Sequence, residues 1–295
     1  CFDFFFFLLL LQTQTIDPEF VILSWENSAG DNSFSEQTAS FILGTLVHVV
    51  DQVSDHAASS LTDHLTDLLQ GFQCTPGLIS ALIRCVIKLN ERAAEGDKLR
   101  ARKLNAATMK PLVRRCDTTL RNFALRGNEI NTEAVVAHLH TLGELALVGA
   151  RDLSAKPLFA VPDTTITALK TLVAPRGGST GTPEVPLNFL SNNSPSGDSE
   201  AGGGLLSVKA FAFVTLGKLA FRSRPLAKSC IGVFIRELMT TTEPVLRNNI
   251  LIVLGDLCRH FTGLVDPYVT NMAQCLSDEH IGVRKNALLL LTELL

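Results

Sequence analysis

Apolar residues recur along most of the chain in stretches long enough to form buried helices. Three such stretches are 210–216, 250–254 and 287–291. A helix that is apolar on nearly every face must be covered on nearly every face, as happens when helices stack in layers. The alternation of apolar and polar residues that marks strands, with hairpin turn residues between, is absent. The pattern predicts an all-α protein with essentially no sheet.

A five-residue pattern, Leu-Gly-x-Leu followed by an apolar residue, lies near the end of these stretches. Copies begin at Leu43, Leu142, Leu216 and Leu254, and a fifth copy without glycine begins at Leu291. The last three begin 38 and then 37 residues apart. A period near 40 residues with two helices per unit is typical of HEAT and armadillo arrays. We therefore predict a HEAT-repeat α-solenoid of stacked antiparallel helix pairs.

Two residue types recur at fixed places in this repeat. Glycine inside a helix costs roughly 1 kcal/mol relative to alanine, so glycine at one repeat position predicts close approach by a neighbouring helix. Asp278 precedes Arg284 by six residues, as in HEAT repeats whose turn aspartate pairs with an arginine of the neighbouring unit. Thr241 holds the equivalent place before Arg247, so an incomplete ladder of ion pairs is expected.

Capping signals locate helices through the chain. A capping box from Ser33 to Glu36 precedes a helix that ends at Val53, and Asp266 with Pro267 opens another. The remaining predicted helices span 76–94, 98–125, 132–148, 164–173, 205–221 and 225–239.

The chain divides by composition into four segments. Residues 1–30 are poorly defined, 31–173 are helical repeats, 174–204 are an insertion and 205–295 are further HEAT repeats. Within 1–30, residues 2–11 are apolar except Asp3, too short to span a bilayer and without the flank of a secretory signal. They are either foreign to the fold or the edge of a terminal helix. The missing initial methionine and the apolar end at Leu295 are typical of a fragment.

The insertion is rich in residues that disfavour packed structure. Of its 31 residues, 16 are Gly, Pro or Ser, so it is predicted to be disordered. Without it, Leu142 and Leu216 stand 43 residues apart, close to one repeat. The insertion is therefore expected to replace the turn between the two helices of one repeat. Thr182 and Ser194 each precede a proline, as proline-directed phosphorylation sites do.

The sequence shows no arrangement of residues suited to catalysis. His48, His56 and His64 are eight residues apart, whereas metal ligands on a helix need spacings of three or four. Seven cysteines lie far apart without a Cys-x-x-Cys pair, which favours buried thiols in a reducing compartment over a disulfide framework. We expect no enzymatic activity, cofactor, metal or small-molecule substrate.

Basic residues are concentrated between Arg84 and Arg126, where 12 Lys and Arg stand against 4 Asp and Glu. This stretch carries +8 in a chain of formal charge −3, which leaves −11 for the remainder. Lys103, Lys110 and Arg114 are spaced to share one helix face, and Arg115 follows directly. One interpretation is a solvated face. The other is a ridge that contacts phosphates, because clustered Lys and Arg bind nucleic acid without sequence preference. Arg100 and Arg102 are expected on other faces.

The carboxy-terminal third resembles a particular family. The stretch 208–219 reads Val-Lys-Ala-Phe-Ala-Phe-Val-Thr-Leu-Gly-Lys-Leu, and 247–250, 255–258, 264–268, 275–278, 283–285 and 290–295 continue the likeness. These segments resemble the D-type HEAT-repeat subunits of condensin, strongly from 204 to 295 and more weakly from 132 to 174. Cys258, Cys275 and the pair Phe261-Thr262 favour the condensin II member.

The resemblance implies a non-catalytic scaffold for mitotic chromosome condensation, located in the nucleus and on chromosomes. Implied partners are the kleisin subunit, the SMC ATPase pair, a second HEAT subunit, and DNA or chromatin without sequence specificity. No membrane partner is expected. Two alternatives from other classes stay open: an importin-like or adaptin-like receptor that binds peptide cargo, and a regulatory scaffold of a phosphatase. A ladder of tryptophans and asparagines would favour the receptor, and Trp25 alone does not form one.

Overall fold

A computed structural model of the chain describes residues 16–30, 35–126, 131–148, 158–174 and 199–294. Within these ranges every regular element is a helix and no strand occurs, which confirms the all-α prediction. The chain forms two compact units, Cys1–Leu112 and Val113–Leu295. The boundary between them falls inside one long helix, α6 (Lys98–Arg126).

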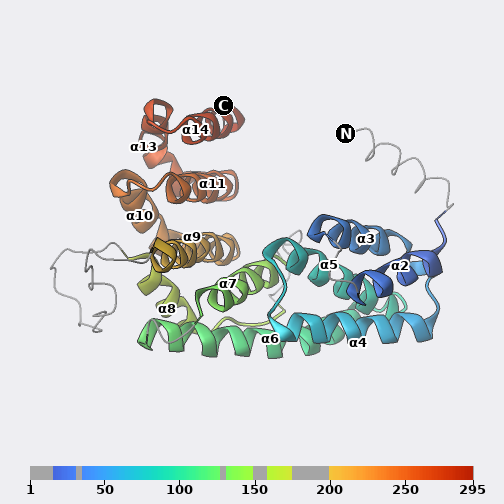
Figure 1. The fold of residues 1–295 in the computed structure, drawn as a ribbon. Coiled ribbons are helices and arrows are strands. Elements are labelled where there is room, and N and C mark those ends of the chain that lie inside the picture. The colour runs from blue at the N-terminus through green and yellow to red at the C-terminus, as the bar shows by residue number, and fades with distance from the viewer. Residues whose placement is uncertain (1–15, 31–34, 127–130, 149–157, 175–198, 295) are drawn as a thin grey trace. The chain divides into compact units, whose positions relative to one another are not determined.

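The first unit contains four helices before α6, of which two pack side by side and each of these is covered by one of the other two. The helices are α2 (Pro18–Gly30), α3 (Glu36–Val49), α4 (Asp55–Gly71) and α5 (Pro76–Ala93), with the 3-10 turn η1 (Val50–Gln52) after α3. Helices α3 and α5 pack against each other, α2 packs on α3, and α4 packs on α5 (Figure 1).

Helix α2 lies within the segment 1–30, for which no defined fold was predicted. Asp17 accepts a hydrogen bond from the Glu19 backbone N–H at 3.0 Å, and Pro18 occupies the first helical position, where its missing N–H costs nothing. Val21 and Trp25 are 5% and 3% exposed. Burial of these two side chains stabilises the helix, so residues 18–30 are part of the first unit. Residues 1–15 lie outside the described part of the chain.

The second unit repeats a pair of helices. After α6 come α7 (Thr132–Leu147), α8 (Asp163–Val173), α9 (Ser199–Phe221), α10 (Arg224–Thr240), α11 (Pro244–His260), α12 (Thr262–Val265), η4 (Asp266–Tyr268), α13 (Val269–Gln274), η5 (Cys275–Ser277) and α14 (Ile281–Leu294). Helices α7, α9, α11 and α14 pack in succession, while α8 and α10 pack on α9 and α13 packs on α14. Figure 1 shows α9, α11 and α14 stacked one above another. This is the predicted HEAT arrangement.

Glycines of the repeated pattern lie where successive inner helices approach closely. A Cβ atom built on Gly217 of α9 would lie 2.5 Å from Val253 Cγ1 of α11. One built on Gly255 would lie 2.5 Å from Leu290 Cδ2 of α14, and one on Gly143 would lie 3.0 Å from Lys218 Cδ. The predicted close approach is confirmed at these three positions. Gly44 of α3 differs, because a Cβ atom there would meet nothing within 4 Å.

One rung of the expected aspartate–arginine ladder is present. The Arg247 guanidinium lies 2.7 Å from the Asp278 carboxylate through Nε and donates to it from NH2 at 3.1 Å. Arg247 and Arg284 each donate to the carbonyl six residues earlier, of Thr241 and Asp278 respectively, at 2.7 Å. The prediction is confirmed, and Thr241 leaves the ladder incomplete as expected.

The start of α9 differs from the prediction. The second helix of the interrupted repeat was expected from Leu205, whereas α9 begins at Ser199 and includes the three consecutive glycines. A Cβ atom on Gly204 would lie 2.6 Å from Thr132 Oγ1 of α7, so this glycine serves helix contact and not a turn. Helices α8 and α9 pack together, while residues 175–198 of the predicted insertion lie outside the described residues.

Other helix ends differ more locally. Ser35 and not Ser33 caps α3, accepting from the Thr38 N–H at 3.2 Å. The helix predicted from Pro267 is divided into η4, α13 and η5, and α12 precedes it. Pro267 ends the α12 hydrogen-bond pattern because it has no N–H to donate to it.

One helix of the described residues is long and apolar enough to cross a membrane by length and composition, at 203–221. Half of that window is buried, and α9 packs against α7, α8, α10 and α11. These contacts make it a core helix of the second unit.

Candidate functional site

Helix α6 holds all four residues predicted to contact phosphate. A tight turn leads into it, with Gly96 at φ +86° and Glu95 at φ 52°. Asp97 then accepts from the backbone N–H groups of Leu99 and Arg100 at 2.8 and 3.1 Å. This carboxylate satisfies two amides that a helix start leaves unpaired, so the basic helix begins at a defined residue.

One face of α6 is anchored in each unit. In the first unit, the buried Asn90 of α5 donates from Nδ2 to Asn105 Oδ1 at 2.9 Å. Because both amides are buried, this bond fixes the register of α6 on α5. Apolar side chains of α6 are buried in both units: Met109, Leu112, Val113, Cys116, Leu120 and Phe123.

The opposite face of α6 is basic and exposed. The exposed basic residues on it are Arg100, Lys103, Lys110, Arg114, Arg115 and Arg121, while Lys98 is exposed at the helix start in line with the buried residues. Lys103 and Lys110 belong to the first unit, and Arg114 and Arg115 to the second. Arg100 was expected on another face, but it is exposed one helical turn before Lys103. Arg102 is half-buried, so for this residue the expectation holds.

Not every exposed arginine on α6 is available to a partner. Arg121 Nε donates to both carboxylate oxygens of Asp117 at 3.1 Å. Asp117 also accepts from the hydroxyls of Thr165 and Thr164 at the start of α8, at 2.6 and 3.3 Å. The positive charge of Arg121 is thus partly offset, which the sequence count did not anticipate. Thr182 and Ser194, the candidate phosphorylation sites, lie outside the described residues.

The histidines hold no metal site in the described part of the chain, where no group of three or more potential ligands occurs. His48 lies on α3, while His56 and His64 lie on α4. His138 is buried with Nδ1 at 2.6 Å from the Ala134 carbonyl oxygen, and burial lowers its pKa. The His140 ring lies nearly perpendicular to the Phe211 ring, with 5.9 Å between the ring centres.

The cysteines of the described residues are free thiols, and five of the six are buried. Burial raises the pKa of Cys85 to about 12 and also raises that of Cys116. Because a thiolate and not a thiol attacks, these positions offer no nucleophile near neutral pH.

We expect Ellman's reagent at pH 8 to modify Cys85 and Cys116 in the native chain far more slowly than in urea. The raised pKa keeps both thiols protonated until the pH is well above 9, and packing excludes the reagent. Half-buried Cys74 should react sooner and serves as the internal reference. Labelling followed by peptide mass spectrometry measures each site, and equal rates in buffer and urea would contradict the burial.

Two family models match consecutive parts of the chain. The model of the HEAT repeats of condensin-2 complex subunit D3-like proteins matches residues 132–238. The model of non-SMC mitotic condensation complex subunit 1 matches residues 245–295. Together they cover the second unit from α7 to α14, the part built as regular HEAT pairs.

Individual relatives extend the similarity into the first unit. Condensin-2 complex subunit D3-L of Xenopus laevis is 29% identical over 287 residues, covering 95% of this chain and 18% of that protein. Condensin-2 complex subunit D3 of Mus musculus is 28% identical over 289 residues, with the same two shares. The chain thus spans about a fifth of the length of these relatives.

Similarity to the condensin I branch is more local. Condensin complex subunit 1 of Mus musculus is 34% identical, but over 86 residues that make up 29% of this chain and 6% of that protein. The condensin-2 proteins align with almost the whole chain, first unit included. The chain therefore belongs to the D-type HEAT-repeat subunits of condensin and is most like the condensin II member.

Proposed function

We propose that this chain is part of a non-catalytic scaffold subunit of a condensin complex that binds DNA without sequence specificity. Its role would be mitotic chromosome condensation in the nucleus, together with a kleisin subunit, the SMC ATPase pair and a second HEAT subunit. Condensin membership supports this role over the peptide-cargo receptor, since both matched family models are condensin models.

The exposed basic face of α6 is the observation that carries the DNA proposal. Lys103, Lys110, Arg114 and Arg115 project from a helix whose other face is buried. Cations on the exposed face of a packed helix can follow a line of phosphates and release condensed counterions. Interactions of this kind read backbone charge and not base edges, so they carry no sequence preference.

Reversal of charge at Lys103, Lys110, Arg114 and Arg115 to glutamate should weaken binding of the whole chain to any short DNA duplex. The slope of log affinity against log salt should flatten by roughly 0.9 for each phosphate that the variant no longer neutralises. Fluorescence anisotropy with two unrelated duplexes at several salt concentrations measures both quantities. Two double variants, K103E/K110E and R114E/R115E, test the part of α6 in each unit by itself.

The matched control is K228E/R236E, which reverses two exposed basic residues of α10. It makes the same change in net charge as either double variant and should leave much more of the affinity intact. Far-ultraviolet circular dichroism checks that all variants keep their helices. If the quadruple variant binds duplex DNA as tightly as the parent at low salt, the basic face of α6 is only a solvated surface.

A further inference from the structure

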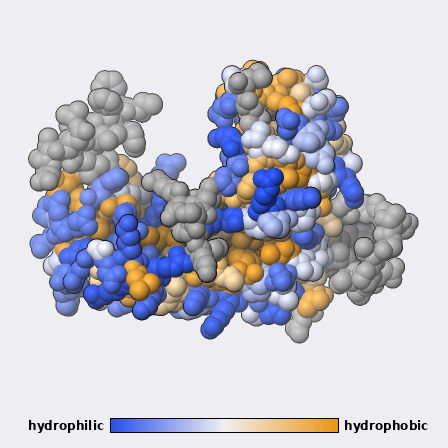
Figure 2. All heavy atoms as spheres, turned by 180° about the vertical axis from the view of Figure 1, so that it is seen from behind, coloured by the Kyte–Doolittle hydropathy of each residue, from blue (hydrophilic) through white to orange (hydrophobic). Residues whose placement is uncertain are grey.

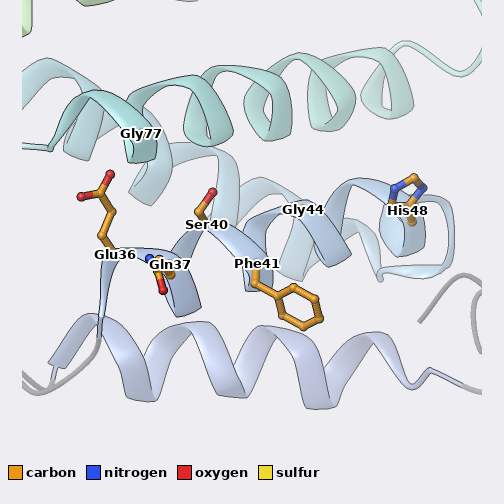
Figure 3. Close-up of a pocket in the computed structure, with 7 residues that line it drawn as sticks. All are labelled: Glu36, Gln37, Ser40, Phe41, Gly44, His48 and Gly77. Carbon is orange, nitrogen blue, oxygen red and sulfur yellow. The ribbon is translucent and has the colours of Figure 1, made fainter. Parts of the chain in front are cut away.

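An open groove runs along α3 in the first unit. It measures about 490 Å³ and is lined by Glu36, Gln37, Ser40, Phe41, Gly44, His48 and Gly77. Figure 3 shows Glu36 and Ser40 directed toward α5 and Phe41 directed toward α2. Gln37, Phe41, Gly44 and His48 are spaced by four, three and four residues, so they form one stripe along the helix.

Gly44, the glycine of the repeated pattern that lies in this groove, differs from its equivalents in the second unit, where another side chain covers the glycine. At Gly217 and Gly255 the side chain of the next inner helix occupies the space over the glycine, with closest approaches of 2.5 Å. At Gly44 nothing lies within 4 Å of a Cβ atom. A helix glycine with no neighbour costs stability without an internal reason. The space over Gly44, called the slot below, is therefore open to a side chain of a partner molecule.

Apolar side chains are exposed beside this slot. Phe41 is 55% exposed, and on the α2 side Phe20 and Leu23 are 68% and 56% exposed. A second groove lies between α2 and α3 and is lined in part by Ile16, Phe20, Phe41 and Ile42. Figure 2 shows exposed apolar patches beside hydrophilic side chains in each unit. Contiguous exposed apolar surface of this kind marks a site of interaction.

The charged residues that line the two grooves are acidic, and α2 and α3 carry no Lys or Arg. No Lys or Arg occurs before Arg84, whereas nine Asp and Glu lie between Asp17 and Asp67. Four of these are exposed on or next to α2 and α3: Asp17, Glu19, Glu26 and Glu36. The others of the described residues lie on η1 and α4, where Asp55 pairs with Arg92 at 2.8 Å. Glu36 lines one groove and Asp17 the other. Such a rim repels phosphate and attracts cations, so this surface selects a partner opposite in charge to DNA.

We infer that the α2–α3 surface binds a basic amphipathic helix of a protein partner. Apolar residues at helical spacing enter the slot over Gly44 and the space between Phe20 and Phe41. Lys and Arg at the edges of that helix then lie near Asp17 and Glu36. Helix-in-groove recognition of this kind places anchors one and two turns apart. The proposal is independent of DNA binding by α6, because it uses other helices and the opposite charge.

The test titrates the whole chain with a labelled peptide of leucine and lysine, about 18 residues long, patterned with one apolar helix face. Fluorescence anisotropy should show binding that weakens about tenfold or more in Gly44→Leu, where leucine fills the slot. The matched control is Gly232→Leu on α10, where a Cβ atom would also meet nothing within 4 Å. This variant should bind the peptide as tightly as the parent chain does. D17K/E36K should weaken binding through charge, and K103E/K110E should not.

Four outcomes overturn the proposal. The first is no binding of the peptide, and the second is unchanged affinity in Gly44→Leu. The third is that either of two control peptides binds as tightly as the leucine–lysine peptide: one with glutamate in place of lysine, or one with its leucines spread around the helix. The fourth is a concentration-dependent dimer in sedimentation velocity that Gly44→Leu abolishes, because the occupant would then be a second copy of this chain.

Discussion

Gly217→Val is expected to lower the free energy of unfolding by about 3 kcal/mol, at the upper end of the usual cost of overpacking. The new Cβ atom would lie 2.5 Å from Cγ1 and 2.7 Å from Cγ2 of Val253. Val253 is β-branched, so its rotamer in a helix is nearly fixed and cannot turn aside. Helix α11 must therefore move away from α9, which loosens the stack on both sides. Urea denaturation followed by circular dichroism measures the destabilisation.

The same substitution at other repeat positions provides the control. Gly255→Val should cost less, because Leu290 meets the new atom with the flexible end of its side chain, Cδ2 at 2.5 Å. Gly44→Val should change the free energy of unfolding by no more than about 0.5 kcal/mol, as surface substitutions usually do. Equal destabilisation at Gly217 and Gly44 would mean that close approach by a neighbouring helix does not explain the repeated glycine.

Glu237→Ala is expected to destabilise the second unit by about 3–5 kcal/mol, the usual cost of leaving a buried charge without its partner. Glu237 of α10 accepts from Lys209 Nζ of α9 at 2.5 Å. The side chains are 5% and 20% exposed, respectively. Removal of the carboxylate strands the ammonium group at the contact between the two helices of neighbouring repeats. Thermal and urea unfolding of the variant measure the effect.

The double variant K209M/E237M separates the charge effect from packing. Two methionines keep much of the volume and leave no unpaired charge, so the double variant should be considerably more stable than Glu237→Ala and close to the parent. The exposed pair Lys88–Glu91, at 2.7 Å with both side chains about half exposed, is the reference. Glu91→Ala should cost no more than about 1 kcal/mol. A similar small cost for Glu237→Ala would show that Lys209 reaches water when its partner is removed.

Within the described ranges, the sequence by itself determined the helical class, the repeat and the rung of its ladder. Long apolar stretches force helices into layers, and the recurrence of Leu-Gly-x-Leu identifies the inner helix of each pair. The contacts of Gly143, Gly217 and Gly255 follow from that recurrence, as does the pairing of Asp278 with Arg247. These features were predictable because each depends on a pattern that local physics imposes on every repeat alike.

The tertiary structure alone decided the features that depend on distant neighbours. Helix α2 is ordered by the burial of Val21 and Trp25, and glycine-rich residues join α9 because Gly204 lies against Thr132. Asp117 pairs with Arg121 one turn along α6, but it accepts from Thr165 only because the fold brings α8 to α6. Gly44 stands in the same Leu-Gly-x-Leu pattern as Gly217, and yet a Cβ atom there would meet nothing within 4 Å. Composition counts charges and glycines one by one, whereas their effect depends on which side chain of another helix lies within a few ångströms.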